Sequence, residues 1–228
     1  MPVLEIENLR KAFVPPGASA PVPVVDIAAF RLEAGEQVAL SGTSGSGKTT
    51  LLNLIAGILP ADAGRIQVDG RDMTALGEAG RDRLRASSIG YIFQTFNLLQ
   101  GFSCLENVLL GMSFGPGPDP AHARSLLGRV GLADRLDYRP RQLSTGQQQR
   151  VAVARAVANR PRLVLADEPT GNLDPANARQ ALELIRGICT ESNAALLLVS
   201  HDPAVLGSFG RVVPLQELNR AARREERP

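Results

Sequence analysis

The chain begins with two segments in which apolar and polar residues alternate. Residues 4–13 and 24–32 show this pattern, which predicts two β-strands. Residues 14–23 are rich in proline, glycine and alanine and predict the loop between them. Residues 65–68, closed by an Asp-Gly pair, predict the edge of a hairpin. We therefore expect an antiparallel β lobe on the N-terminal side of the fold.

Further along the chain, short apolar runs alternate with segments of helical periodicity. The runs that predict strands are residues 37–41, 89–93, 162–166 and 194–199. The segments that predict helices are residues 49–56, which Gly57 ends, 147–158 and 175–189. This alternation is typical of an α/β core with a mainly parallel sheet and right-handed crossovers.

Residues 95–139 have a different pattern, because apolar residues recur at helical spacing in two stretches that a Gly-Pro run at residues 115–120 separates. We interpret this segment as a helical insert. The expected organisation is a single domain of residues 1–228, with residues 1–94 and 140–228 forming the core and residues 95–139 forming a helical subdomain.

The composition indicates a globular protein, with 228 residues, 44% hydrophobic, 21% charged and a net charge of +2. The body of the chain has no long basic run, so we expect no nucleic-acid partner. Charge is dense only from Arg220 onward, where mixed signs indicate either a solvated end or a contact with a membrane surface.

The sequence contains no apolar run near the ~18 residues of a transmembrane helix and no signal-peptide pattern at its start. Cys104 and Cys189 lie far apart in sequence and have no metal-ligand spacing, so we expect buried thiols in a reducing compartment. The predicted location is the cytoplasm, and any link to a membrane would pass through a partner.

A glycine-rich run ending in Gly-Lys-Thr follows the strand at residues 37–41 and opens the helix at residues 49–56. This setting predicts a phosphate-binding P-loop, in which backbone N–H groups and the helix N-terminus surround phosphate oxygens. Lys48 would reach the β- and γ-phosphates, and the Thr49 hydroxyl would ligate Mg²⁺. A ligand-free Gly/Ser turn is the alternative. The residues expected to bind nucleotide here are Gly42, Thr43, Ser44, Gly45, Ser46, Gly47, Lys48, Thr49 and Thr50.

Two carboxylates follow the apolar strand at residues 162–166, and strand ends of this kind deliver residues to the ligand crevice of an open α/β sheet. We expect Asp167 to belong to the Mg²⁺ shell and Glu168 to polarise the attacking water. His201 follows the strand at residues 194–199 and is expected to contact the γ-phosphate. The alternatives are a helix-capping acid and a structural histidine.

Residues 143–150 read Leu-Ser-Thr-Gly-Gln-Gln-Gln-Arg and open an amphipathic helix. Ser144 is a candidate N-cap, and Ser144 and Gly146 could donate to an anion at the helix N-terminus. Nothing in the position of this segment requires that the anion lie on the P-loop of the same chain. Asp174 and Pro175 similarly predict the start of the next helix.

The order of these motifs resembles the nucleotide-binding subunit of ABC (ATP-binding cassette) transporters, from Phe13 to His201. The sequences of residues 168–174 and 94–99 are most similar to those of the macrolide-exporter and lipoprotein-releasing branch. The resemblance implies an ATPase with ATP and Mg²⁺ as cofactors, and a separate integral-membrane permease as partner. It also implies a homodimer that closes on ATP.

The resemblance further implies roles for individual residues. Phe13 would stack on adenine, although it could also be a strand-edge residue only. Gln94 would join Thr49 and Asp167 as a metal ligand and relay the state of the site to the membrane subunit. Residues that would act across the dimer interface are Ser144, Thr145, Gly146, Gln147 and Asp174. Glu168 and His201 would be the catalytic pair.

Residues 143–147 match the signature motif of the family except at Thr145, where the family usually has glycine. A side chain is tolerable at this position only if the backbone needs no positive φ. We expect altered closure rather than an inactive site. The helical insert is expected to dock the permease through Phe96, Leu98, Leu99 and Phe102, although these residues could instead fill the core of the insert.

Two other functions fit parts of the pattern. A soluble ABC-type ATPase could act on ribosomes or DNA, but ribosome-associated members usually carry two cassettes. DNA-repair members carry a long coiled coil, and no sustained heptads lie between Lys48 and Ser144. A P-loop kinase or GTPase would leave the signature and His201 unexplained. The transport ATPase explains most of the motifs.

Overall fold

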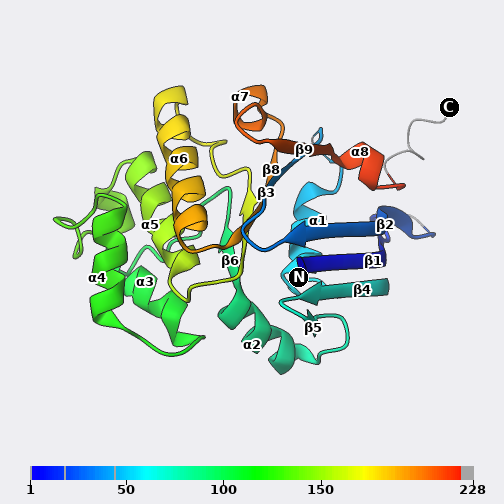
Figure 1. The fold of residues 1–228 in the computed structure, drawn as a ribbon, viewed down its shortest axis with the longest axis horizontal. Coiled ribbons are helices and arrows are strands. Elements are labelled where there is room, and N and C mark those ends of the chain that lie inside the picture. The colour runs from blue at the N-terminus through cyan, green and yellow to red at the C-terminus, as the bar shows by residue number, and fades with distance from the viewer. Residues whose placement is uncertain (1, 18, 44, 222–228) are drawn as a thin grey trace.

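The computed structural model describes residues 2–17, 19–43 and 45–221. Its N-terminal side is a four-stranded antiparallel sheet in the order β2-β1-β4-β5 (Figure 1). The strands are β1 (Pro2–Phe13), β2 (Val22–Glu33), β4 (Ala63–Val68) and the short β5 (Arg71–Asp72). The expected β lobe and the hairpin after residue 68 are therefore present.

A second sheet is parallel and has the order β6-β7-β8-β3-β9. Its strands are β3 (Gln37–Ser41), β6 (Ile89–Ile92), β7 (Leu163–Asp167), β8 (Ala195–Ser200) and β9 (Arg211–Pro214). The carboxyl ends of β3, β7 and β8 meet at one edge of this sheet, as parallel pairing requires. The P-loop follows β3, Asp167 ends β7 with Glu168 directly after it, and His201 follows β8.

Helices cover the parallel sheet and extend away from it. The helices are α1 (Lys48–Ile55), α2 (Glu78–Ser88), α3 (Cys104–Ser113), α4 (Pro120–Arg129), α5 (Thr145–Val157), α6 (Pro175–Glu191), α7 (Pro203–Leu206) and α8 (Leu215–Leu218). Figure 1 places α3 and α4 at the end of the molecule opposite the antiparallel sheet, with α5 beside them. The segment that sequence analysis interpreted as a helical insert does contain two helices.

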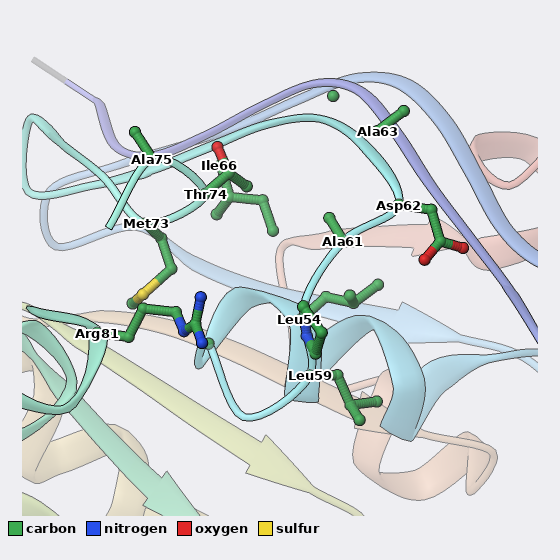
Figure 2. A pocket seen from close by; sticks show the side chains of 13 residues that line it. Leu54, Leu59, Ala61, Asp62, Ala63, Ile66, Met73, Thr74, Ala75 and Arg81 are labelled. Atoms are coloured by element: carbon green, nitrogen blue, oxygen red, sulfur yellow. The ribbon is translucent and has the colours of Figure 1, made fainter. Parts of the chain in front are cut away.

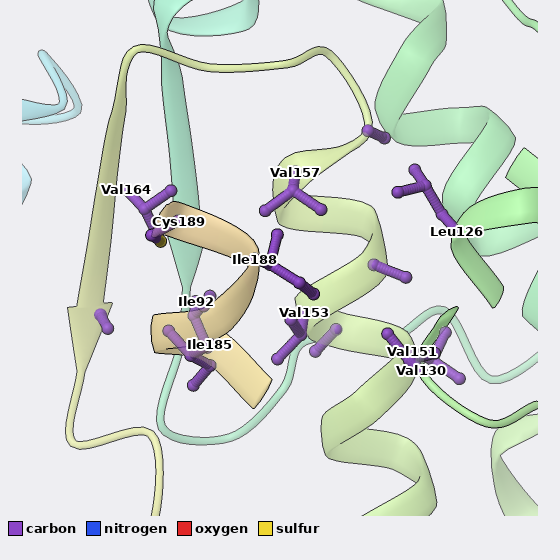
Figure 3. Packing of buried hydrophobic residues seen from close by; sticks show 14 of the residues in the cluster. Ile92, Leu126, Val130, Val151, Val153, Val157, Val164, Ile185, Ile188 and Cys189 are labelled. Atoms are coloured by element: carbon purple, nitrogen blue, oxygen red, sulfur yellow. The ribbon is translucent and has the colours of Figure 1, made fainter. Parts of the chain in front are cut away.

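Two hydrophobic clusters share the strands of the parallel sheet. Val164 and Ala166 of β7 face the cluster that contains α3, α4, α5 and α6, whereas Leu163 and Leu165 face the cluster beneath the antiparallel sheet. Figure 3 shows the first cluster, where side chains from α5 and α6 pack over β6 and β7. Because successive residues of a strand point to opposite faces, one apolar run supplies both cores.

Four elements were not predicted from the sequence: α2, α7, β9 and α8. Leu84 is the only large apolar residue among the buried residues of α2, so the helical period is weak there. β9 has four residues, of which Arg211 and Val212 are exposed. The sequence signal in such short or polar segments is too small, and packing against the rest of the fold determines them.

The apolar residues that follow Gln94 divide into two pairs. Phe96 and Leu98 are buried in the helical cluster, whereas Leu99 and Phe102 are 44% and 39% exposed. Only the second pair is therefore free for docking, and the expectation of one four-residue patch is wrong for the first pair.

Cys104 and Cys189 are both buried free thiols, as expected, and burial raises the pKa of the Cys189 thiol to about 12.

None of the helices within the described residues combines the length and apolar character that a membrane crossing requires.

Candidate functional site

The loop that connects β3 to α1 lies against β2. Gly45 and Gly47 have φ angles of +81° and +91°, a region that side chains other than glycine adopt at a cost. A Cβ atom at Gly47 would lie 2.9 Å from the Val24 carbonyl oxygen. Gly47 therefore has to be glycine both for its backbone angles and for the close approach of β2. Ser44 lies outside the described residues.

Lys48 opens α1 and turns its side chain back into this loop. Its Nζ donates to the carbonyl oxygens of Gly42 and Thr43 at 2.8 and 2.9 Å, and the side chain is only 7% exposed. The ammonium group therefore holds the loop together, a structural contact that the sequence pattern did not predict. The loop thus surrounds the Lys48 ammonium, a positive charge that is suited to binding phosphate.

Ser46 gives the loop an unsatisfied polar group. Its Oγ is buried and has no hydrogen-bond partner within the described part of the chain. Buried hydroxyls are nearly always hydrogen-bonded in native proteins. A phosphate oxygen would accept a hydrogen bond from this hydroxyl, so the loop fits a nucleotide phosphate in its chemistry as well as in its shape.

Glu168 lies between two basic side chains at the end of β7. Its Oε1 is 3.4 Å from Lys48 Nζ, and its Oε2 is 2.6 Å from His201 Nδ1. Glu168 has a φ of +43°, so a strained backbone directs this carboxylate toward the P-loop. Lys48, Glu168 and His201, predicted separately from three strand ends, meet at one place.

Asp167 is buried beside them. Burial raises the pKa of its carboxyl, and the charge of Glu168 raises it further, while the Thr49 hydroxyl and Lys48 lower it. A divalent cation would relieve the repulsion between the two carboxylates. Thr49, Gln94 and Asp167 offer a hydroxyl, an amide and a carboxylate, which are oxygen donors of the kind that Mg²⁺ takes. The donor set therefore fits the expected metal.

These side chains line one cleft of about 580 Å³. Its lining comprises Val24, Thr43, Gly45, Gly47, Lys48, Thr49, Thr50, Gln94, Asp167, Glu168 and His201. Figure 2 shows a smaller cavity elsewhere, between the end of α1 and the antiparallel sheet, lined by Leu54, Ile66 and Met73 among others. That cavity has none of the predicted catalytic residues.

Phe13 lies at the end of β1 and is 40% exposed. The Lys11 ammonium lies 5.4 Å from the ring centroid and is 2.7 Å from Asp62 Oδ1. Phe13 pairs with Val22 of β2, the strand whose Val24 lines the cleft. Phe13 is not itself part of that lining.

The signature residues and Asp174 lie outside the cleft. Ser144 is the N-cap of α5, and it forms a reciprocal pair of hydrogen bonds with Gln147 that closes the helix end. Asp174 caps α6 and accepts from the amide of Asn177. A Cβ atom at Gly146 would lie 2.9 Å from Asn177 Oδ1, so the two helix starts are adjacent. Thr145 begins α5 without a positive φ, which explains how its side chain is tolerated.

Two residues that sequence analysis did not single out hold the segment after β6. Arg155 of α5 donates to the carbonyl oxygens of Phe96 and Asn97, both at 2.6 Å. Both acceptor residues have left-handed backbone angles. Asn172 Nδ2 donates to the Gln94 carbonyl oxygen at 2.7 Å. Only the fold brings these distant residues together, so no local pattern could have indicated them.

A family model described as "ABC transporter" matches residues 25–171, more than half of the chain. The chain belongs to the ABC transporter family. It is 45% identical to the lipoprotein-releasing system ATP-binding protein LolD 2 of Rhodospirillum rubrum, over 94% of each chain. It is 40% identical to the macrolide export ATP-binding/permease protein MacB of Syntrophobacter fumaroxidans, over 95% of this chain but 31% of that one.

The fold agrees with that of solved ABC cassettes. The dimeric post-hydrolysis state of the ATP-binding cassette MJ0796, bound to ADP and Pi, superimposes with a TM-score of 0.84 and 30% sequence identity, covering 96% of this chain and 95% of that one. The chain is thus an ABC-type ATPase of α/β fold, and its relatives include lipoprotein-releasing and macrolide-exporting systems. The resemblance inferred from the motifs is confirmed.

Proposed function

We propose that two copies of this chain close on ATP and energise a separate integral-membrane permease. The observation that carries the proposal is the meeting of Lys48, Glu168 and His201 in one cleft, while the signature lies outside it. A site that holds phosphate but lacks the signature needs a second surface to complete it. In a head-to-tail pair, Ser144, Thr145, Gly146, Gln147 and Asp174 would supply that surface to the partner's ATP.

The P-loop residues, from Gly42 to Thr50, would bind the phosphates, and Phe13 would stack on adenine. Lys48 would exchange its contact with Glu168 for the β- and γ-phosphates. Glu168 would then accept the proton of the attacking water, and His201 would hold this carboxylate in place and contact the γ-phosphate. Mg²⁺, held by Thr49, Gln94 and Asp167, would neutralise charge on the phosphates.

We further propose the domain division expected from the sequence, with residues 95–139 as a helical subdomain between two parts of the core. Leu99 and Phe102 are exposed on it and would dock the permease. The chain would then lie in the cytoplasm, held at the inner face of the cell membrane by the permease.

Arg155 ties the turn after Gln94 to α5, the helix that begins in the signature motif. Movement of α5 would therefore reach the docking surface.

Turnover measured over a range of chain concentrations tests the proposal directly. If two copies complete each site, the rate of phosphate release per chain should rise with concentration until the dimer is saturated. A rate per chain that stays constant over a hundredfold dilution would contradict the dimer. Absence of phosphate release in Mg-ATP at every concentration would contradict the ATPase itself.

A further inference from the structure

A buried asparagine from the C-terminal segment contacts the P-loop. Asn219 follows α8, is 1% exposed and uses every hydrogen-bonding position of its side-chain amide. Its Nδ2 donates to the Val24 carbonyl oxygen at 2.8 Å and to the Ser46 carbonyl oxygen at 3.4 Å. Its Oδ1 accepts from the backbone N–H groups of Asp26 at 2.8 Å and Ala221 at 3.2 Å.

The Val24 carbonyl is free for this contact because β2 has an irregularity at that point. Lys11 pairs with Val25 and the next residue, Ala12, pairs with Pro23, so Val24 is an extra residue in β2. The same carbonyl oxygen lies close to Gly47, where a Cβ atom would approach it to 2.9 Å. Asn219 thus lies where an irregular strand and the P-loop meet.

The contact with Ser46 has a consequence for the direction of the next N–H group. In a planar trans peptide, the Ser46 carbonyl and the Gly47 N–H point in opposite directions. A hydrogen bond that draws the Ser46 oxygen toward Asn219 therefore turns the Gly47 N–H to the other side of the loop. Lys48 Nζ binds the Gly42 and Thr43 carbonyl oxygens of the same loop, so the loop is held from two sides.

The C-terminal segment is itself attached to the strand that leads into the loop. β9 pairs in parallel with β3, and Leu215 of α8 is buried in the cluster beneath the antiparallel sheet. Figure 1 shows α8 beside the start of β2 and near α1. Asn219 also forms a backbone bridge to Ile27 of β2. The position of Asn219 is therefore fixed by contacts with both sheets.

We propose that Asn219 is a positioning residue for nucleotide binding, which orients the Ser46–Gly47 peptide so that the Gly47 N–H faces the phosphates. The proposal rests on the nucleotide-binding function of the P-loop proposed above. It assigns the C-terminal segment a role in setting nucleotide affinity, although none of its described residues lines the cleft.

The test compares Mg-ADP affinity, measured by calorimetry on the full chain, between wild type and N219D. Aspartate keeps an acceptor for the Asp26 and Ala221 N–H groups but loses the donor to Val24 and Ser46. The matched control is N107D, because Asn107 is another fully buried asparagine whose amide binds only backbone groups, in the helical insert. Both variants should lower the unfolding temperature, but only N219D should weaken Mg-ADP binding, by about tenfold.

Equal affinity of N219D and wild type would overturn the positioning role, as would an equal loss of affinity in N107D. If N219D does not fold, N219S takes its place, because a serine hydroxyl introduces no buried charge. In N219S we expect faster hydrogen exchange in residues 45–48 than in wild type, together with weaker binding. Failure of wild type itself to bind Mg-ADP would contradict the proposed function and is distinguishable from both outcomes.

Discussion

Lys48 and Glu168 form an ion pair within the nucleotide cleft, with 3.4 Å between Nζ and Oε1. One partner is predicted to bind phosphate and the other to accept a proton from water, so each neutralises the other until a nucleotide separates them. If both proposed roles hold, phosphate binding at Lys48 would release the Glu168 carboxylate for catalysis.

Substitution of Glu168 by glutamine should separate binding from hydrolysis. The amide keeps the shape of the side chain but cannot accept the water proton, so turnover should fall by about 100-fold or more. Loss of the ion pair leaves Lys48 free for phosphate, and Mg-ATP affinity should be equal or higher. The variant should accumulate as an ATP-bound dimer of doubled mass on size exclusion. Turnover at the parent rate would show that Glu168 is not the base.

Substitution of Lys48 by alanine should abolish tight nucleotide binding. The expected loss of Mg-ATP affinity is on the order of 10- to 100-fold, the contribution of hydrogen bonds to a charged group. Because Lys48 also binds two loop carbonyls, a modest loss of stability should accompany it. Lys48→Met keeps the length of the side chain and should lose affinity equally. Calorimetry with unchanged affinity in either variant would count against the P-loop assignment.

Substitution of Asp167 by asparagine should stabilise the ligand-free chain while weakening Mg²⁺-dependent ATP binding. The raised pKa of Asp167 means that the folded state binds this proton more tightly than the unfolded chain does. The contribution of the Asp167 carboxyl to the free energy of unfolding therefore decreases as pH rises from about 4 through the folded-state pKa. The unfolding temperature of D167N should exceed that of wild type by roughly 2 °C at neutral pH, and the gap should close in acid.

Asp62 provides the control of opposite sign. Its hydrogen bond from Lys11 lowers the pKa of its carboxyl, so its stabilising contribution is present at neutral pH and lost as pH falls. D62N should therefore be less stable than wild type at neutral pH and approach it in acid. A pH series in which D167N behaves like D62N would disprove the assignment of an electrostatic cost to Asp167.

Charge substitutions at Leu99 and Phe102 should uncouple this chain from its permease. Both side chains are exposed, so L99E and F102E should fold and hydrolyse ATP within about twofold of wild type. Assembly with the permease, or transport, should be lost because a charge enters an apolar interface. L98E is the control for misfolding, since Leu98 is buried. Loss of folded structure in L99E and F102E, judged by circular dichroism, would favour a core role instead.

Substitution of Thr145 by glycine should strengthen dimer closure by about 1 kcal/mol, or roughly fivefold in ATP turnover at low chain concentration. Ser144 and Gln147 cap α5 without any help from the Thr145 side chain, so glycine should loosen the helix little. Turnover at several concentrations is the measurement, because a closure effect must diminish once dimers are saturated. A uniform loss of rate at all concentrations would mean that Thr145 orders the helix end.

Most residues of the cleft were predicted from the sequence because they follow buried strands, and parallel pairing brings such strand ends together. Val24 of β2 also lines the cleft and was not predicted. Sequence reasoning did not identify the partners that hold the cleft residues. The contacts of Lys48 with Gly42 and Thr43 were not predicted, because they depend on a turn that the glycines permit but do not specify. Arg155 and Asn219 bind carbonyl groups far away in sequence, and nothing in the local pattern marks such contacts.

The position of β3 between β8 and β9 bears on how the molecule is first made. This strand, Gln37–Ser41, is synthesised long before either of its neighbours, Ala195–Ser200 and Arg211–Pro214. A nascent polypeptide cannot complete the central sheet until residues 195–214 have left the exit tunnel, because the hydrogen-bonding edges of β3 have no partners before then. The growing chain should therefore expose an apolar strand until β8 and β9 have been synthesised, and it should need protection by chaperones during that time.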